Sequence, residues 1–118
     1  MKTHKDLDVW NRSIELVTRI YGVTQSFPES EKFGLVNQIR RASVSVASNI
    51  AEGAARSSKK EFAQFLYMAL GSTSELETQL LISKNLGYLL KDSFDYLNDC
   101  LKNISKMLLG LIRFLKKN

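Results

Sequence analysis

Apolar residues recur along most of this chain at alternating spacings of three and four positions, which is the repeat of one helix face. The repeat falls into four segments. The only proline, Pro28, separates the first two, because proline disfavours a helical conformation in the residue before it. Short stretches around Ser58 and Gly87 separate the others. Four such segments with short connections predict an all-α fold, an antiparallel up-and-down four-helix bundle.

One line of residues in each segment is expected to face the core. Ser58, followed three residues later by Glu61, fits a capping box that starts the third helix. Gly87 is expected to end that helix, and Asp92 or Ser93 to cap the fourth. The four expected core lines are Leu7, Trp10, Ile14, Val17 and Tyr21; Leu35, Ile39, Ala42, Val46, Asn49 and Gly53; Phe62, Leu66, Ala69, Thr73, Leu76, Leu80 and Ser83; and Phe94, Leu97, Leu101, Ile104, Leu108, Leu111 and Leu115.

Further apolar residues lie away from these lines. They either widen the core-facing stripe of each helix or form a second apolar face that is buried against other copies of the chain. We favour the second explanation, so the pattern predicts a homo-oligomer. These residues are Val9, Leu16, Ile20 and Val23 in the first segment, Tyr67, Leu70 and Leu81 in the third, and Tyr96, Cys100, Met107 and Phe114 in the fourth.

The second segment contains the stretch QIRRASVSVASNIAEG, which places small residues where a core usually has larger ones. Ser43, Ala47 and Ala54 would let a neighbouring helix come close, which increases van der Waals contact. Gly53 is expected to let the helix run out into the turn at Arg56. The third segment offers a counterpart, because Gly71 costs helix stability that a close crossing would explain. We therefore expect this small-residue face to meet Gly71 and Ser72.

Polar residues on these helices are expected to stabilise the bundle. Asn49 lies on a core line, where it either fixes the register of the helices or reaches a ligand, and we favour the first role. Glu52 and Glu75 are interpreted in the same way. Their expected partners are Arg40, Arg41 and Ser or Thr hydroxyls. Because no activated nucleophile, partner histidine or metal set accompanies these carboxylates, the sequence predicts a protein that is not an enzyme.

Composition narrows the class of protein. The 118 residues, 44% hydrophobic and 25% charged, are typical of one soluble globular domain, here residues 1–118. One cysteine and one histidine leave no disulfide and almost nothing for a zinc or iron site, and no nucleotide-binding motif occurs, so we expect no metal and no cofactor. No stretch is long and apolar enough to span a membrane, and the charged N-terminus lacks an export signal. We therefore expect a cytoplasmic protein without a membrane partner.

Several short motifs resemble those of one bacterial protein family. They are DVW at 8–10, QIRRA at 38–42, NIAEG at 49–53, EFAQFL at 61–66, ALGS at 69–72, EL at 75–76 and GY at 87–88. In this order and spacing they resemble the four-helix bundle proteins encoded in 23S rRNA intervening sequences. The resemblance covers nearly the whole chain and implies a barrel-shaped homopentamer with a basic surface. It also implies a relationship to the accessory proteins of diversity-generating retroelements, which engage a reverse transcriptase and nucleic acid.

Two functions fit the sequence. The formal net charge of +5 suits a protein that binds RNA or DNA, and the candidate phosphate contacts are Arg40, Arg41, Arg56, Lys59 and Lys60. The same side chains could equally be solvated, or form ion pairs between subunits. No aromatic platform for stacked bases is evident, so binding would be largely independent of sequence. The alternative function is a protein-interaction module that docks a partner enzyme, such as a reverse transcriptase, without touching nucleic acid.

The beginning of the third helix is the most basic candidate region. Arg56, Lys59 and Lys60 cluster there, and the free N–H groups of the first helical turn would also favour a phosphate. A C-terminal set, Arg113, Lys116 and Lys117, could add to the positive field.

Overall fold

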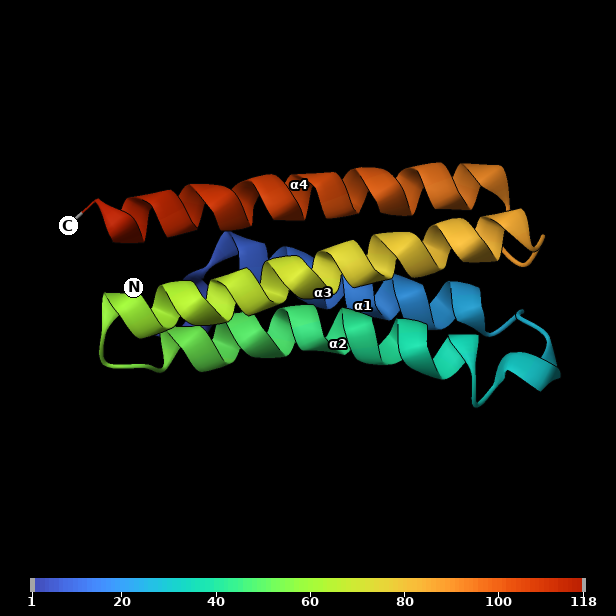
Figure 1. Ribbon diagram of the computed structural model, residues 1–118, viewed down its shortest axis with the longest axis horizontal. Helices are drawn as coiled ribbons and strands as arrows, with labels where there is room; N and C mark the ends of the chain where they lie inside the picture. Colours follow the sequence, from blue (N-terminus) through green and yellow to red (C-terminus); the bar gives the residue numbers. More distant parts are fainter. Residues whose placement is uncertain (1, 118) are drawn as a thin grey trace.

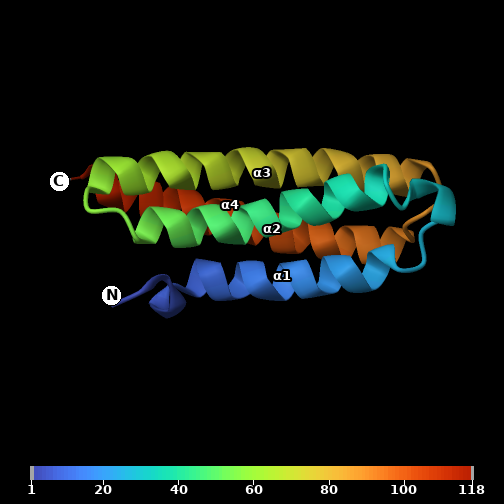
Figure 2. The same ribbon diagram turned by 90° about the horizontal axis from the view of Figure 1, so that it is seen from below.

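A computed structural model describes residues 2–117 and shows four long helices. They are α1 (Asp8–Thr24), α2 (Leu35–Ala54), α3 (Lys59–Asn85) and α4 (Lys91–Lys116), with single 3-10 turns η1 (His4–Asp6) and η2 (Glu29–Glu31). Successive helices run in opposite directions and lie side by side in both views (Figure 1 and Figure 2). The bundle measures 47 × 23 × 19 Å. The predicted antiparallel four-helix bundle is confirmed, and no strand occurs among residues 2–117.

Local sequence explains where α3 begins and ends. Ser58 Oγ accepts the backbone N–H of Glu61 at 3.1 Å, so the expected start of α3 is confirmed. At the other end Gly87 has a φ of +81°, a conformation that residues with a Cβ rarely adopt. The N–H groups of Gly87 and Tyr88 bond back to carbonyls in the last turn of α3. This Schellman motif reverses the chain into α4.

The expected cap of α4 is wrong. α4 begins at Lys91, and its N-cap, Leu90, makes no side-chain hydrogen bond to the helix. Asp92 and Ser93 lie inside the first turn instead. The carboxylate of Asp92 still favours the helix there, because negative charge is stabilised near a helix N-terminus.

The core is one continuous cluster of aliphatic side chains from all four helices. In α3, every residue of the expected core line is buried. In α4 and α2 most of the expected line is buried too, while Leu35, Asn49, Phe94 and Leu111 lie at the margin and are half-buried. The heptad-like repeat therefore identified the core-facing side of three helices.

The core line expected for α1 is wrong. Leu16 and Ile20 are buried, whereas Ile14 and Tyr21 of the expected line are 41% and 40% exposed. α1 has apolar residues on two adjacent lines, and the line that enters the core is the one that also contains polar Ser13.

Two hydroxyl groups make this burial possible. Ser13 Oγ donates to the Val9 carbonyl and Thr24 Oγ1 donates to the Ile20 carbonyl, each at 2.8 Å within α1. A buried hydroxyl with a hydrogen-bond partner avoids the desolvation penalty of an unpaired one. These two residues interrupt the apolar repeat on the buried side, which is why the repeat favoured the other line.

The contact between α2 and α3 is the most extensive in the bundle. Its closest approach is at Gly53, where a Cβ would lie 2.8 Å from Phe65 Cβ and 3.2 Å from the Phe62 carbonyl oxygen. Further along the same pair of helices, Ser45 Oγ and Ser72 Oγ form a hydrogen bond of 2.9 Å. Small residues thus bring these two backbones together.

Two expected contacts with α3 are not formed. Gly71 is exposed, and a Cβ built on it would meet nothing within 4 Å, so the predicted close crossing at this glycine is wrong. Ala47 is buried on the side of α1, where it lines a groove with Trp10. The side of α2 that meets α3 includes Ser45, and Ala47 lies two positions on, a rotation of roughly 200° in a helix.

Candidate nucleic-acid interface

Charge is unevenly distributed along the bundle. The half with the α2–α3 turn and both chain ends comprises residues 2–14, 46–72 and 103–117 (Figure 1). It holds ten Lys and Arg against four Asp and Glu, whereas the remaining residues hold seven against eight. The entire excess of positive charge therefore lies in one half, here called the basic end. Its ten cationic residues are Lys2, Lys5, Arg12, Arg56, Lys59, Lys60, Lys106, Arg113, Lys116 and Lys117.

The α2–α3 turn forms the tip of the basic end. Arg56, Lys59 and Lys60 are all exposed there. Arg56 lies 3.8 Å from the Glu52 carboxylate and its guanidinium stacks 4.7 Å from the centre of the Phe65 ring. Glu52 therefore pairs with Arg56 rather than with the expected Arg40 or Arg41. An exposed ion pair of this length contributes little to stability and leaves the arginine available.

The first turn of α3 is less open to an anion than expected. The Ser58 hydroxyl already accepts the backbone N–H of Glu61, and it donates to the Glu61 carboxylate at 3.1 Å. A carboxylate thus occupies the position near the helix N-terminus that a phosphate would prefer. At this end the lysine side chains, rather than the backbone N–H groups, are therefore the candidate contacts for an anion.

A groove opens between the beginning of α3 and the end of α4. Its volume is about 410 Å³, and three lysines and no carboxylate line it. Lys116 Nζ donates to the Tyr67 hydroxyl at 3.0 Å and lies 5.1 Å from the centre of that ring. Tyr67 is 47% exposed. The lining residues are Lys59, Lys60, Ala63, Gln64, Tyr67, Leu115 and Lys116.

Sequence reasoning placed Lys59 and Lys60 here but missed this groove. It treated Tyr67 as a surplus apolar residue and Lys116 as part of a C-terminal charge cluster. The two are 49 positions apart and meet because α3 and α4 are antiparallel, so the end of one lies beside the beginning of the other. The sequence does contain a signal for this groove. It is an aromatic residue near the beginning of α3, which an antiparallel α4 places beside a C-terminal lysine.

Arg40 does not belong to the candidate interface. Its Nε donates to Thr24 Oγ1 at 3.0 Å, and one terminal nitrogen donates to the Tyr21 carbonyl at 3.3 Å. The guanidinium also stacks on the Tyr21 ring, 4.4 Å from its centre. Arg40 is half-buried and fastens α2 to the last turn of α1, so its cationic group is already engaged within the chain.

Arg41 and Glu75 belong to a different surface. Both line a polar groove of about 500 Å³ between α2 and α3, beside Phe33, which is 86% exposed. Within residues 2–117, Glu75 has no cation within ion-pair distance, so its expected pairing with an arginine is not formed in the single chain. Arg41 lies in the electrically neutral half, away from the lysines of the α2–α3 turn.

Asn49 has a structural position. It is half-buried and donates to the Ser45 carbonyl at 2.9 Å and to Ser45 Oγ at 3.0 Å. Ser45 in turn bonds to Ser72 across the helix pair at 2.9 Å. Asn49 therefore supports the α2–α3 register through Ser45. Ser43, also expected to pack, is wholly buried, and its hydroxyl donates to the Arg40 carbonyl at 2.8 Å.

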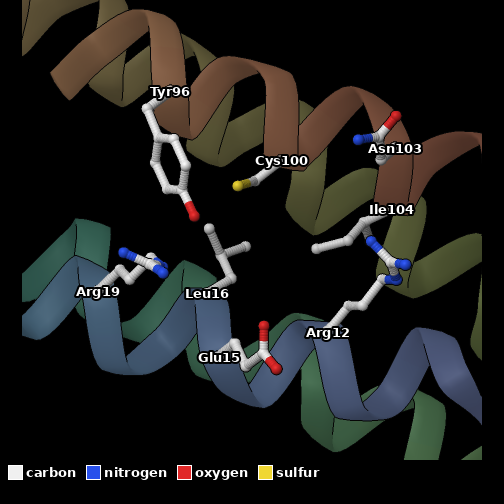
Figure 3. A pocket seen from close by; sticks show the side chains of 8 residues that line it. All are labelled: Arg12, Glu15, Leu16, Arg19, Tyr96, Cys100, Asn103 and Ile104. Carbon is white, nitrogen blue, oxygen red and sulfur yellow. The ribbon is translucent and has the colours of Figure 1, made fainter. Parts of the chain in front are cut away.

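A smaller hollow of about 110 Å³ separates α1 from α4 (Figure 3). The Tyr96 hydroxyl points into it, and the Arg19 guanidinium lies 4.7 Å from the centre of the Tyr96 ring. Desolvation of the hydroxyl by burial, together with the neighbouring Cys100 thiol, raises the pKa of Tyr96 above its usual value of 10. The hollow is lined by Arg12, Glu15, Leu16, Arg19, Tyr96, Cys100, Asn103 and Ile104.

Apolar side chains line a third groove, between α1 and α2. It has a volume of about 300 Å³ and contains Trp10, Ile14 and Val17 of the line that was expected to enter the core. Ile14 and Val44 beside it are 41% and 40% exposed. α1 therefore has two apolar faces, but Leu16 and Ile20, which were assigned to the second face, enter the core, and part of the expected core line lies outside along this groove.

The described residues contain neither a metal site nor a membrane-spanning helix. No group of three or more His, Cys, Asp or Glu side chains there is placed to hold a metal ion. None of the four helices has an apolar stretch sufficient to cross a membrane.

The fold and the charge distribution together define a class of protein, an antiparallel helical bundle with one basic end. The chain belongs to the 23S rRNA-intervening sequence protein family, whose model matches residues 5–110. A similar solved structure is a protein of unknown function from the S23 ribosomal protein family of Bacteroides thetaiotaomicron. It is 27% identical, with a TM-score of 0.82 over 88% of this chain and 97% of that one. No curated protein matches the chain significantly.

Proposed function

We propose that the protein is a non-enzymatic, homopentameric accessory factor that binds RNA or DNA through its basic end. The observation that supports this function is the separation of charge, with ten cations against four anions in one half and near neutrality in the other. A nucleic acid, with its closely spaced phosphates, is a polyanion that such a surface attracts. Arg56, Lys59, Lys60 and Lys116 are the proposed phosphate contacts, while Arg40 serves the fold.

The proposed assembly uses the outer apolar face of α1 and α2. Trp10, Ile14 and Val44 line an open apolar groove there, and such a surface gains stability when a second subunit covers it. The resemblance to the intervening-sequence proteins implies five copies. Native mass spectrometry at micromolar concentration tests the assembly, and a clean monomer would contradict it.

Binding across a salt series tests the nucleic-acid function. Wild type is titrated with a structured RNA, alongside a triple variant with Arg56→Ala, Lys59→Ala and Lys60→Ala. A plot of log affinity against log salt has a negative slope. Loss of three phosphate contacts should make that slope shallower by about 2 to 3.

A second triple variant, with Lys32→Ala, Lys84→Ala and Lys102→Ala, removes the same charge from the neutral half. It should retain the wild-type slope. Equal losses in the two variants would show that net charge alone, and not the basic end, determines affinity. Absence of RNA and DNA binding by wild type at low salt would reject the function itself.

A second function is supported by the opposite end of the bundle. Three large apolar side chains are strongly exposed in its two connections, Phe33 at 86%, Leu86 at 54% and Leu90 at 78%. Exposed apolar residues at one end of a bundle suit the docking of a partner protein, here proposed to be a reverse transcriptase. A Phe33→Ser and Leu90→Ser variant should lose binding to such an enzyme in calorimetric titration and keep its RNA affinity. Unchanged enzyme binding would reject this docking surface.

A further inference from the structure

The groove at the basic end has a composition that a general phosphate-binding surface does not need. Besides its three lysines it contains an aromatic ring, Tyr67, and an apolar floor. That floor is formed by Ala63 and Leu115, which are 5% and 8% exposed. A surface that contacts only phosphates uses cations and polar donors, whereas an aromatic ring beside cations suits a base with its phosphate.

The position of Lys116 keeps the Tyr67 ring accessible. The ammonium group is 3.0 Å from the hydroxyl but 5.1 Å from the ring centre, so it lies at the hydroxyl end of the ring. The hydrogen bond fixes the ring direction while the side chain remains 47% exposed. An oriented, partly open ring between cations is the arrangement on which unstacked bases pack in proteins that bind single strands.

The remaining groups of the groove fit a nucleotide as well. Lys59 and Lys60 enter from the first turn of α3, and Gln64 follows one turn later with an amide that can both donate and accept. No acidic side chain lines the groove. Its volume of about 410 Å³ lies within the range of small-ligand sites.

We propose that this groove binds a nucleotide of a single-stranded RNA or DNA, with the base stacked on Tyr67 and the flanking phosphates held by Lys59, Lys60 and Lys116. This proposal rests on the proposed nucleic-acid function and specifies its ligand. A base inside a duplex is stacked on both faces and cannot reach a recessed ring, so the groove selects single strands.

The test measures fluorescence anisotropy of labelled single-stranded RNA, single-stranded DNA and a duplex of equal length. Wild type should bind single strands more tightly than the duplex. Tyr67→Leu should weaken single-strand binding at least about fivefold and leave duplex binding unchanged. The ratio of RNA to DNA affinity identifies which single strand the groove prefers, since only RNA offers a 2′-hydroxyl.

Two matched variants separate stacking from other effects. Tyr67→Phe keeps the ring and loses only the hydrogen bond to Lys116 that orients it, so it should retain most of the single-strand affinity that Tyr67→Leu loses. Tyr96→Leu removes a tyrosine of equal exposure, 47%, which also has a cation over its ring but lies on the α1–α4 hollow. It should have no effect, and thermal melts followed by circular dichroism verify that all variants are folded.

The possible failures are distinguishable. If Tyr67→Leu binds single strands like wild type, or loses single-strand and duplex binding equally, the stacking role is overturned while the basic end can still bind nucleic acid. Equal losses for Tyr67→Phe and Tyr67→Leu would overturn it too, because the hydroxyl would then be the important group. Absence of binding to all three ligands at low salt would reject the proposed function as a whole.

Discussion

The two helix pairs on opposite sides of the bundle are packed in different ways. Between α2 and α3 small residues let the backbones approach, with Gly53 against Phe62 and a hydrogen bond between Ser45 and Ser72. Between α1 and α4, by contrast, long polar side chains surround a hollow of about 110 Å³ (Figure 3). The contact between α1 and α4 is the least extensive of the four neighbouring helix pairs.

From this difference we expect residue size, more than hydrophobicity, to determine which helix pair responds more strongly to substitution. Both helix pairs bury leucines, but in the α2–α3 pair Gly53 and Ser45 also lie directly against the neighbouring helix. Close-packed regions respond strongly to a change of one methyl group, whereas regions beside a hollow can relax. The following substitutions test this contrast, from the largest expected effect to the smallest.

Truncating one buried leucine in each helix pair should lower the free energy of unfolding by different amounts. Leu66→Ala in α3 should lower the free energy of unfolding by about 3–5 kcal/mol, since its surroundings cannot collapse. Leu16→Ala in α1 should lower it by about 2–3 kcal/mol, because Leu16 already borders the hollow. Urea denaturation measures both. An equal or larger loss for Leu16→Ala would contradict the contrast.

Two helical glycines provide a second comparison. Gly53→Ala should lower the free energy of unfolding by roughly 1–3 kcal/mol, because its Cβ would lie 2.8 Å from Phe65 Cβ. Gly71→Ala, which meets nothing within 4 Å, should raise it by about 0.5–1 kcal/mol through helix propensity alone. Thermal and urea unfolding of the two variants would refute the close approach if both shifted in the same direction.

Removing a polar contact between α2 and α3 should also cost more stability than removing one beside α4, although both losses are smaller than those above. Ser72→Ala removes the 2.9 Å hydrogen bond to Ser45 and should cost about 1 kcal/mol. Arg12→Ala removes the exposed 3.3 Å ion pair with Asp8 beside α4 and should cost less than about 0.5 kcal/mol. Denaturation at low and high salt measures both, and only the second value should depend on salt.

The smallest expected effect concerns Tyr96 in the α1–α4 hollow. Its raised pKa means that the folded chain favours the neutral phenol. The contribution of Tyr96 to the free energy of unfolding is therefore present below the ordinary tyrosine pKa of 10. It is lost as pH rises through the raised pKa of Tyr96. Ultraviolet or NMR titration should place Tyr96 above 10, and Cys100→Ala should bring it closer to 10. An unchanged pKa of Tyr96 in that variant would rule out the Cys100 thiol as a cause of the shift.

The sequence predicts the bundle well, because its helices are long, periodic and separated by clear breaks. The core line of α3 follows directly from its spacing, and Ser58 and Gly87 mark its two ends by local chemistry. α1 is the exception. Its apolar residues form two lines, and the choice between them depends on which neighbours are present, since Ser13 and Thr24 on the buried line bond within their own helix.

The candidate site was predictable only in part. Arg56, Lys59 and Lys60 are neighbours in the chain, so their clustering at one turn could be predicted. The role of Arg40 depends on Thr24, sixteen positions away, and the groove depends on a contact between Tyr67 and Lys116. Contacts between distant residues follow from how the helices are aligned, which residue spacing within one helix does not specify.

The uneven placement of charge has a consequence for motion in solution. A rod 47 Å long with a net charge at one end has a permanent electric moment along its axis, so the field of a distant polyanion exerts a torque on it. At an ionic strength of 0.1 M that field decays over about 10 Å, and rotation occurs only during the final approach. In dilute salt the rod turns earlier and arrives with the α2–α3 turn foremost. Ionic strength thereby controls not only how often the molecule meets a polyanion but which of its ends makes the first contact.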